Sequence, residues 1–487
     1  MCSSLSSIVC CFSLALALFF GRFACPEALA QEGTPLGKPL ETRIQELEET
    51  VRRLEQAKSA LADDKPVDPS VLSAINLPEE PKAKTPILAG WDNGFILRSP
   101  NDDFKLRITG QIQSDYRDYL DHNDTTDVPS FLVRRARLGI EATVLKYYEF
   151  RLLPDFGQGT PRIVDSYFNI HYWDALQFEV GKFKQAFSFE QLIQDRFVPT
   201  VERSLIDQLG PQRDVGLMVH GQKLFDDRLD YGVTVYNGVQ NGDQDSDRNK
   251  EMSARVAIRP FKQSESEGLL DGLQLGLGGT WGNDTSPLAP TIYRTPANVA
   301  WFRYATGARP DGVRWRLSPE LVYLNGPFSL TSQYYHESRD MRPAADKKGI
   351  EPLSEVKANG FFVMTTLLVT GENRTSMSQN IDPLRPFNPR DGLLGPGAWE
   401  LVGRVSHLEF GDDDNPAAFT RLINRATTSR AATEMTSGFN WYLNKFVRVQ
   451  FNWEYARFGD AIRLGGAGPG GLRDHQNSFV TRLQIVF

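Results

Sequence analysis

Residues 447–455 read Val-Arg-Val-Gln-Phe-Asn-Trp-Glu-Tyr, and apolar and polar side chains alternate along them without a break. Successive side chains of a β-strand point to opposite faces, so this stretch predicts a strand with one apolar and one polar face. The same period of two recurs in residues 132–144, 313–323 and 479–487. About sixteen such segments follow residue 91, with an error of about two, and they predict an all-β protein.

The lengths of the connections favour a transmembrane antiparallel β-barrel over a soluble sandwich, which would show the same alternation. Bacterial barrels have short periplasmic turns and long external loops. If residues 104–119 form a strand that rises outward, the predicted external loops are residues 120–129, 184–213, 237–251, 411–431 and 459–476. The predicted periplasmic turns are then residues 145–146, 174–175, 325–327 and 444–446. Residues 371–398 are too long for that side, so a missed strand pair there, or at residues 299–304, is an alternative.

Residues 1–30 predict a secretory signal peptide. Residues 8–20 are apolar, and Ala28-Leu29-Ala30 supplies a small-residue cleavage motif, although no Lys or Arg precedes the apolar stretch. All four cysteines lie within the first 25 residues, so cleavage after Ala30 leaves a chain without cysteine in an oxidising compartment. The alternative is a lipoprotein with Cys25 as the lipidated residue, and the residues before Cys25 suit it poorly.

Residues 38–62 predict a short helix with a heptad pattern, and hence a periplasmic coiled coil. The a positions are Ile44, Val51 and Lys58, and the d positions are Leu40, Leu47, Leu54 and Leu61. A helix of this length is marginal alone, so we expect it to self-associate. The alternative is an amphipathic helix that lies on its own protein. Residues 63–90 are rich in proline and predict an extended linker, and residues 91–487 form the predicted barrel domain.

The composition limits the possible functions. The formal net charge of −7 gives no reason to expect a nucleic-acid partner. No G-x-S-x-G, H-E-x-x-H or C-x-x-C motif occurs, and the six histidines are scattered, so we expect neither an enzyme nor a cofactor. A barrel hydrolase and a structural barrel that anchors the envelope through its coiled coil are the alternatives. Conductance in a planar bilayer distinguishes them, because only a porin gives large ohmic steps.

Several motifs between residues 131 and 242 carry a resemblance to a known family. They are Val-Arg-Arg-Ala-Arg-Leu-Gly-Ile-Glu at 133–141, Phe-Arg-Leu-Leu-Pro-Asp-Phe-Gly at 150–157, Gly-Lys-Phe-Lys-Gln-Ala-Phe at 181–187, Arg-Asp-Val-Gly at 213–216 and Tyr-Asn-Gly at 236–238. In this order they resemble the phosphate-selective porin O and P family. The resemblance implies a sixteen-stranded barrel, a homotrimer in the outer-membrane lipid of a Gram-negative-type bacterium, and passive diffusion with a preference for anions. The solute of one member does not transfer safely to another.

The third external loop, residues 184–213, contains most of the candidate site residues. In the resembling porins this loop folds into the lumen, and the motif at 181–187 places Lys184 in the anion site of the phosphate-specific members. The candidate pore residues are Lys184, Arg196, Arg203 and Arg213 of this loop, with Arg135 and Arg137 of the wall. Continued alternation would send Lys182 and Lys184 toward lipid, so either both lie at the membrane rim or a bulge near Gly181 turns one of them inward. The resemblance favours the second for Lys184. Inward wall positions carry basic and acidic residues in near balance, so wall charge alone does not establish anion selectivity.

The sequence therefore predicts an outer-membrane porin for small polar or anionic solutes, with phosphate or polyphosphate as candidates. A weak calcium candidate lies in the loop at residues 237–251, where Asp243, Asp245 and Asp247 alternate along the chain. The EF-hand pattern fails because Arg248 stands where glycine is needed. A solvated polar loop is the favoured interpretation, and no metal is expected.

Overall fold

The computed structural model describes residues 45, 48, 49, 52 and 86–487, except 121–127, 240–244, 246, 263–267, 347–352, 413 and 464–471. The chain divides into Met1–Lys84 and Thr85–Phe487. Of the predicted coiled coil only four positions are described, and all four are helical. The rest of it, the signal peptide and most of the linker lie outside the described residues. Within the described part, no helix is both long enough and apolar enough to cross a membrane.

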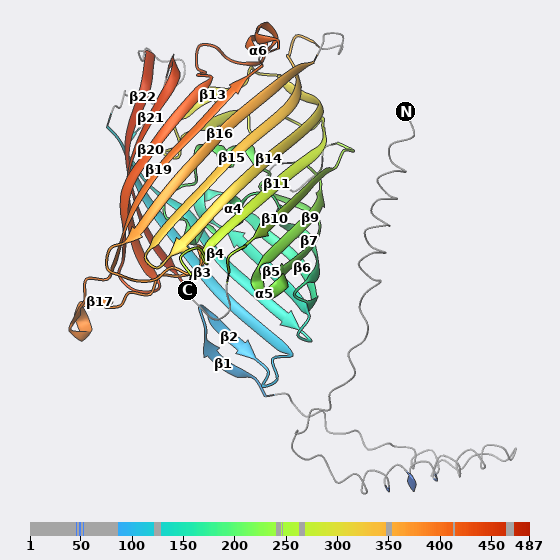
Figure 1. Cartoon of the computed structure of the whole chain (residues 1–487), viewed down its shortest axis with the longest axis vertical. Coiled ribbons are helices and arrows are strands. Elements are labelled where there is room, and N and C mark those ends of the chain that lie inside the picture. The colour runs from blue at the N-terminus through green and yellow to red at the C-terminus, as the bar shows by residue number, and fades with distance from the viewer. Residues whose placement is uncertain are drawn as a thin grey trace, which may run out of the picture. The chain divides into compact units, whose positions relative to one another are not determined.

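Sixteen antiparallel strands form a closed barrel (Figure 1). In chain order they are β3 (Phe104–Tyr119), β4 (Ser130–Val144), β5 (Tyr148–Asp155), β6 (Arg162–Trp173), β7 (Leu176–Lys184), β8 (Arg213–Lys223), β9 (Leu229–Tyr236), β10 (Glu251–Ile258), β11 (Leu273–Asp284), β14 (Arg309–Asn325), β15 (Phe328–Arg342), β16 (Ser354–Leu368), β19 (Ala398–Gly411), β20 (Ala431–Tyr442), β21 (Val447–Arg463) and β22 (Leu472–Val486). Each pairs with its neighbour in sequence, and β22 closes the ring by pairing with β3. The predicted all-β barrel and its strand count are confirmed.

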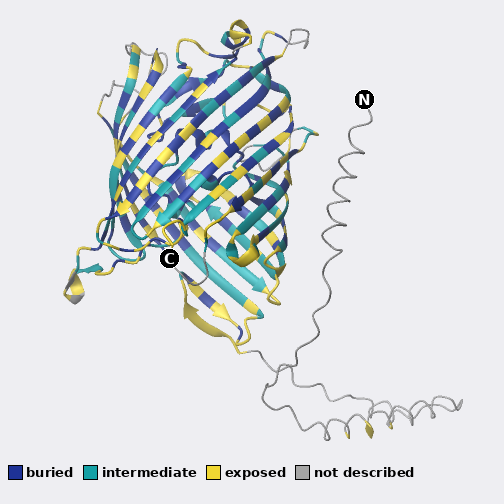
Figure 2. Ribbon diagram, viewed as in Figure 1, coloured by how far each residue is buried: buried dark blue, intermediate teal, exposed yellow. Residues whose placement is uncertain are grey.

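Alternation of side chains explains the barrel, because each strand has an inner and an outer face. In β19, Glu400 and Arg404 are buried inside, whereas Leu401 and Val405 are exposed on the outside. Figure 2 shows this banding along most strands of the barrel. Exposed apolar side chains would be unfavourable in water, but they suit a wall that faces lipid.

The seam between the first and last barrel strands is fixed by the last residue of the chain. The backbone N–H of Phe487 donates to Gly110 O at 2.9 Å, and Gly110 N–H donates to Phe487 O at 2.8 Å. The ring of Phe487 lies 6.1 Å from that of Trp91 and 5.9 Å from that of Phe95. These two rings belong to a hairpin of β1 (Leu88–Trp91) and β2 (Phe95–Arg98), and β2 pairs with β3.

Most connections have the predicted lengths, although the one between β10 and β11 is longer than a short turn, and the long segment predicted to be periplasmic contains no barrel strand. Residues 369–397 carry only β17 (Phe387–Asn388), η4 (Pro389–Asp391) and β18 (Leu393–Leu394), which lie outside the barrel sheet. Residues 285–308 carry β12 (Ile292–Arg294) and β13 (Ala300–Arg303), which pair only with each other. Neither segment adds a strand pair to the barrel, so the alternative of a missed pair is wrong. Outside residues 185–212, the other short helices of the described part are η1 (Gly157–Gly159), α5 (Leu224–Asp227) and α6 (Pro416–Leu422).

Part of the lumen is filled by an apolar core that the sequence did not lead us to expect. Rings of the loop at 285–308, among them Tyr293, Trp301 and Phe302, are fully buried, and Phe302 stacks on Phe410 with ring centroids 4.1 Å apart. Inward residues of the wall join this core, including Phe362. A signal was present in β16, where apolar side chains occupy both faces. This core therefore leaves only part of the barrel interior to polar side chains and open space.

Candidate functional site

The third external loop lies inside the barrel and crosses its lumen. We call residues 185–212 the inner loop; it contains α4 (Phe189–Leu192), η2 (Asp195–Phe197) and η3 (Leu205–Leu209). The opposite wall holds its backbone. Asn440 and Gln450 donate to Pro199 O at 2.9 Å each, and Val201 N–H donates to the side chain of Asn452 at 2.6 Å. The loop therefore narrows the pore by fixed contacts, as the resemblance implies.

The turn from β7 into the inner loop depends on Gly181. Its φ is +128°, and a Cβ at this position would lie 2.3 Å from Ser166 O, so only glycine fits. Beyond it, Lys184 Nζ donates to Leu192 O at 3.2 Å and to Ile193 O at 2.8 Å. The pairing of β7 with β6 and β8 continues through Gly181 without a register shift, so the bulge expected there is absent. Lys184 nevertheless lies inside, where it caps the end of α4.

A cavity of about 510 Å³ lies beside the inner loop, and its lining is strongly basic. Three acidic residues line it, Asp195, Glu202 and Asp207. Nine basic residues line it: Arg117, Arg134, Arg135, Arg137, Arg162, Lys182, Arg203, Arg213 and Arg294. Nine positive and three negative side chains give a formal excess of six positive charges in the lining itself. Its arginines Arg117, Arg137 and Arg213 also pair with acids outside the lining, Asp115, Asp155 and Asp165. The near balance predicted for the whole wall therefore does not hold in this passage.

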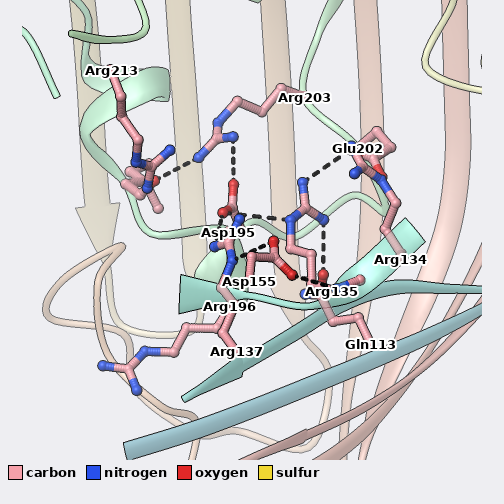
Figure 3. A network of polar contacts seen from close by, with 12 residues as sticks. Gln113, Arg134, Arg135, Arg137, Asp155, Asp195, Arg196, Glu202, Arg203 and Arg213 are labelled. Carbon is pink, nitrogen blue, oxygen red and sulfur yellow. Dashed lines mark hydrogen bonds and ion pairs between the residues drawn. The ribbon is translucent and has the colours of Figure 1, made fainter. Parts of the chain in front are cut away.

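Two carboxylates of the inner loop connect the arginines of this cavity (Figure 3). Glu202 lies 2.7 Å from Arg134 Nε and 2.8 Å from Arg482 Nη2, and its second oxygen lies 3.4 Å from Arg135 Nη2. Asp195 pairs with Arg137 and Arg203, each at 2.5 Å. On this side, ion pairs join the loop to the wall.

The acids of the inner loop differ in protonation. Burial alone would raise the pKa of Asp195, but the charges of Arg135 and other arginines outweigh it and hold the pKa well below its usual value. Burial would likewise raise the pKa of Glu202, but the charges of the surrounding arginines, with that of Arg134 contributing most, hold it well below its usual value. For Asp207, burial dominates over the charge of Arg203 and raises the pKa to about 7. Asp195 and Glu202 are therefore ionised at neutral pH, whereas Asp207 titrates there.

The structure places the six candidate pore residues in three different settings. Four of them line the cavity, namely Arg135, Arg137, Arg203 and Arg213. Lys184 is tied to backbone carbonyls of the inner loop and does not line the cavity, whereas Lys182 of the same motif does. Arg196 lines two smaller spaces of about 30 and 20 Å³, and its guanidinium lies 4.8 Å above the ring of Phe197. No ion pair of Arg196 is found among the described residues. The role of each in selectivity stays a prediction.

Five basic residues of the cavity were not among the candidate pore residues, although alternation had placed the first of them inward: Arg117, Arg134, Arg162, Lys182 and Arg294. Arg134 faces outward by strict alternation, because its neighbour Arg135 faces inward. A bulge explains the difference: Gln113 pairs with Arg135 and Ser114 with Val133, so Arg134 is the extra residue. Arg294 comes from the loop at 285–308, whose position inside the barrel alternation cannot predict.

The calcium candidate gains no support from the residues that are described. Asp243 lies outside them, and Asp245 pairs with Lys250. Asp247 accepts from the backbone N–H of Asn249 at 2.8 Å and from the hydroxyl of Thr285 at 2.8 Å. Its carboxylate thus joins two loops. Among the described residues, no group of three or more acids, histidines or cysteines is arranged to hold a metal ion.

Comparison with known proteins identifies one family model, described as phosphate-selective porin O and P, which matches residues 106–487. No curated protein matches the chain at a significant level. Among solved structures, OmpT of Vibrio cholerae aligns with 11% identity and a TM-score of 0.48 over 80% of this chain and 99% of its own. An anion-selective porin from Comamonas acidovorans aligns with 12% identity and a TM-score of 0.46 over 79% and 100%. At sequence identities and TM-scores this low, the similarity to these structures does not indicate a function.

Proposed function

The chain belongs to the phosphate-selective porin O and P family, and from this premise we propose that its outer-membrane barrel lets small anions diffuse in preference to neutral or cationic solutes. The cavity beside the inner loop is the part of the passage that makes this choice. Candidate solutes are small organic anions and phosphate.

A single observation carries the proposal, namely the excess of six positive charges in the lining of the cavity. Fixed charges around a narrow passage attract counter-ions and exclude co-ions. Their effect is stronger in a narrow, partly desolvated space than in bulk water, because the effective dielectric constant is lower there. Guanidinium groups also match oxyanions through paired hydrogen bonds, and eight of the nine basic residues are arginines.

Swelling of liposomes that contain the purified protein tests the proposal. Gluconate, glucose and glucosamine have similar size and differ in charge, so their rates of entry report charge selection. We expect gluconate to enter fastest and glucosamine slowest. Equal rates would mean that the pore selects by size alone, and fastest entry of glucosamine would contradict the proposal.

A channel for diffusion needs no chemical step, and we propose that the protein is not an enzyme.

The anchoring alternative rests on the predicted coiled coil at residues 38–62. We propose that the protein is a homotrimer and that this segment self-associates in the periplasm. The isolated segment should associate at high concentration, and replacing Leu47 and Leu54 by Asp should abolish association, because each buried leucine contributes about 1.5–3 kcal/mol. A monomeric wild-type segment would contradict this part of the proposal.

A further inference from the structure

We propose that the carboxylate of Glu202 is a tethered occupant of an anion site, and that a permeating oxyanion exchanges with it. The site consists of the guanidinium groups of Arg117, Arg134, Arg135 and Arg482, which we call the arginine cradle. This inference rests on the proposed anion preference and adds a specific residue and a specific step to it.

The geometry of the cradle is that of a ligand site. One oxygen of Glu202 lies 2.7 Å from Arg134 Nε, 2.8 Å from Arg482 Nη2 and 3.5 Å from Arg117 Nη2. The other lies 3.3 Å from Arg134 Nη2 and 3.4 Å from Arg135 Nη2. Arg134 therefore holds the carboxylate with two parallel contacts, the arrangement in which arginine binds free carboxylates and phosphates most strongly. A dianionic oxyanion carries more acceptor oxygens than Glu202 and can satisfy the same donors.

Three of the four cradle arginines, Arg117, Arg135 and Arg482, have other partners in the wall and are held there when Glu202 leaves. The side chains of Arg482, Arg117 and Arg135 are only 1%, 7% and 7% exposed. Arg482 is also held by Asp115, with contacts of 2.6 and 2.8 Å, and Arg135 donates to Gln113 at 2.8 Å. Among the described residues, the ion pairs that these four positive groups keep without Glu202 are those with Asp115 and Asp195. The vacated site thus has an excess of two positive charges, which matches a dianion.

Glu202 can leave the cradle without moving the inner loop. Its backbone carbonyl accepts from Arg404 Nη1 at 2.8 Å and from the hydroxyl of Thr200 at 2.7 Å. The preceding residue, Val201, is held by Asn452 and by Arg482. Only the side chain of Glu202 must change rotamer for its carboxylate to leave the cradle. Glu202 lines the cavity and is 14% exposed, so an incoming anion reaches it directly.

Exchange with a tethered group has a kinetic advantage for a channel. Four arginines without a resident carboxylate would hold a dianion tightly, whereas conduction requires binding that is weak enough for release. Because Glu202 remains at a high local concentration beside the cradle, it competes with every bound anion and promotes its release. The structure thereby accounts for an acidic residue at the most basic place in the passage.

The test is phosphate block of chloride current in planar bilayers at pH 8, with the full-length protein. Glu202→Gln removes the negative charge that occupies the cradle. The block by inorganic phosphate should become about tenfold tighter, because a tethered competitor with a local concentration in the millimolar range is removed. Asp207→Asn is the matched control, since it also removes one negative charge from the cavity lining but lies outside the cradle. It should change the phosphate block no more than about twofold, because it alters only the overall electrostatic potential of the cavity.

A second control separates loss of the competitor from loosening of the loop. Glu190 accepts from Ser204 N–H at 2.8 Å and from the Ser204 hydroxyl at 2.6 Å, and it does not line the cavity. Glu190→Gln should therefore leave the phosphate block unchanged. Equal effects of Glu202→Gln and Asp207→Asn would overturn the exchange model, and so would a weaker block in Glu202→Gln. Wild-type channels that prefer cations would instead contradict the proposed function itself.

Discussion

Replacing Gly110 by alanine should destabilise the closed barrel, because the new methyl group would meet the ring of Phe487. A Cβ at residue 110 would lie 2.2 Å from Cε1 and 2.3 Å from Cζ of that ring. The ring cannot turn aside freely, since the rings of Trp91 and Phe95 lie 6.1 and 5.9 Å from it. Overpacking of this kind costs about 1–3 kcal/mol. We expect this loss in the free energy of unfolding by urea from lipid vesicles.

A double-mutant cycle identifies the ring as the cause. Phe487→Ala alone removes a half-buried ring, and we expect a loss toward the lower end of about 1.5–3 kcal/mol. In the double variant the methyl group meets no ring, so its stability should equal that of Phe487→Ala, with a coupling energy of about 1–3 kcal/mol. Gly403→Ala is the control, because a Cβ there has only the Thr365 hydroxyl within 4 Å, at 3.7 Å. Additive effects of the two seam substitutions would refute the reasoning.

Three further predictions concern charge. Lys182→Glu changes the lining of the cavity by two charges, so the reversal potential in a salt gradient should move toward cation preference; an unchanged value would place Lys182 outside the ion path. Burial raises the pKa of Asp207 to about 7, so protonation below pH 7 removes a negative charge from the cavity. Anion preference measured in bilayers should therefore rise when the pH is lowered from 8 to 6. The Asp207→Asn variant should not show this rise. Glu251→Ala leaves two buried arginines without their shared partner and should lower the free energy of unfolding by about 3–5 kcal/mol, which urea titration measures.

The barrel could be predicted from the sequence because its surroundings impose a simple rule. Strands between lipid and a polar lumen must alternate, and alternation sets both their number and their ends. The predicted strand at residues 104–119 coincides with β3, Phe104–Tyr119. The rule applies to local sequence and needs no knowledge of distant contacts. Alternation fails to predict the direction of a side chain where a bulge adds one residue to a strand. The bulge at Arg134 is such a case, and it brings Arg134 into the cavity lining.

The cavity could be predicted only in part because its members come together through the fold of the inner loop. Alternation along its strand predicted that Arg135 faces the lumen, and the resemblance of the third external loop to that of known porins pointed to Arg203. Alternation places Lys182 and Lys184 on the same face and cannot predict which of them lines the cavity, whereas the structure brings Lys182 there. The four-arginine contact of Glu202 combines residues from β3, β4, β22 and the inner loop, and no spacing in the sequence encodes it.

The central claim, that the basic cavity makes the barrel an anion-preferring porin, is tested most directly by the reversal potential of single wild-type channels in a potassium chloride gradient. The measurement uses the purified full-length protein in neutral lipid, so that the fixed charge of the pore determines the sign. The account predicts ohmic single-channel steps with a reversal potential of the sign set by chloride. A reversal potential at zero or of the sign set by potassium would contradict it.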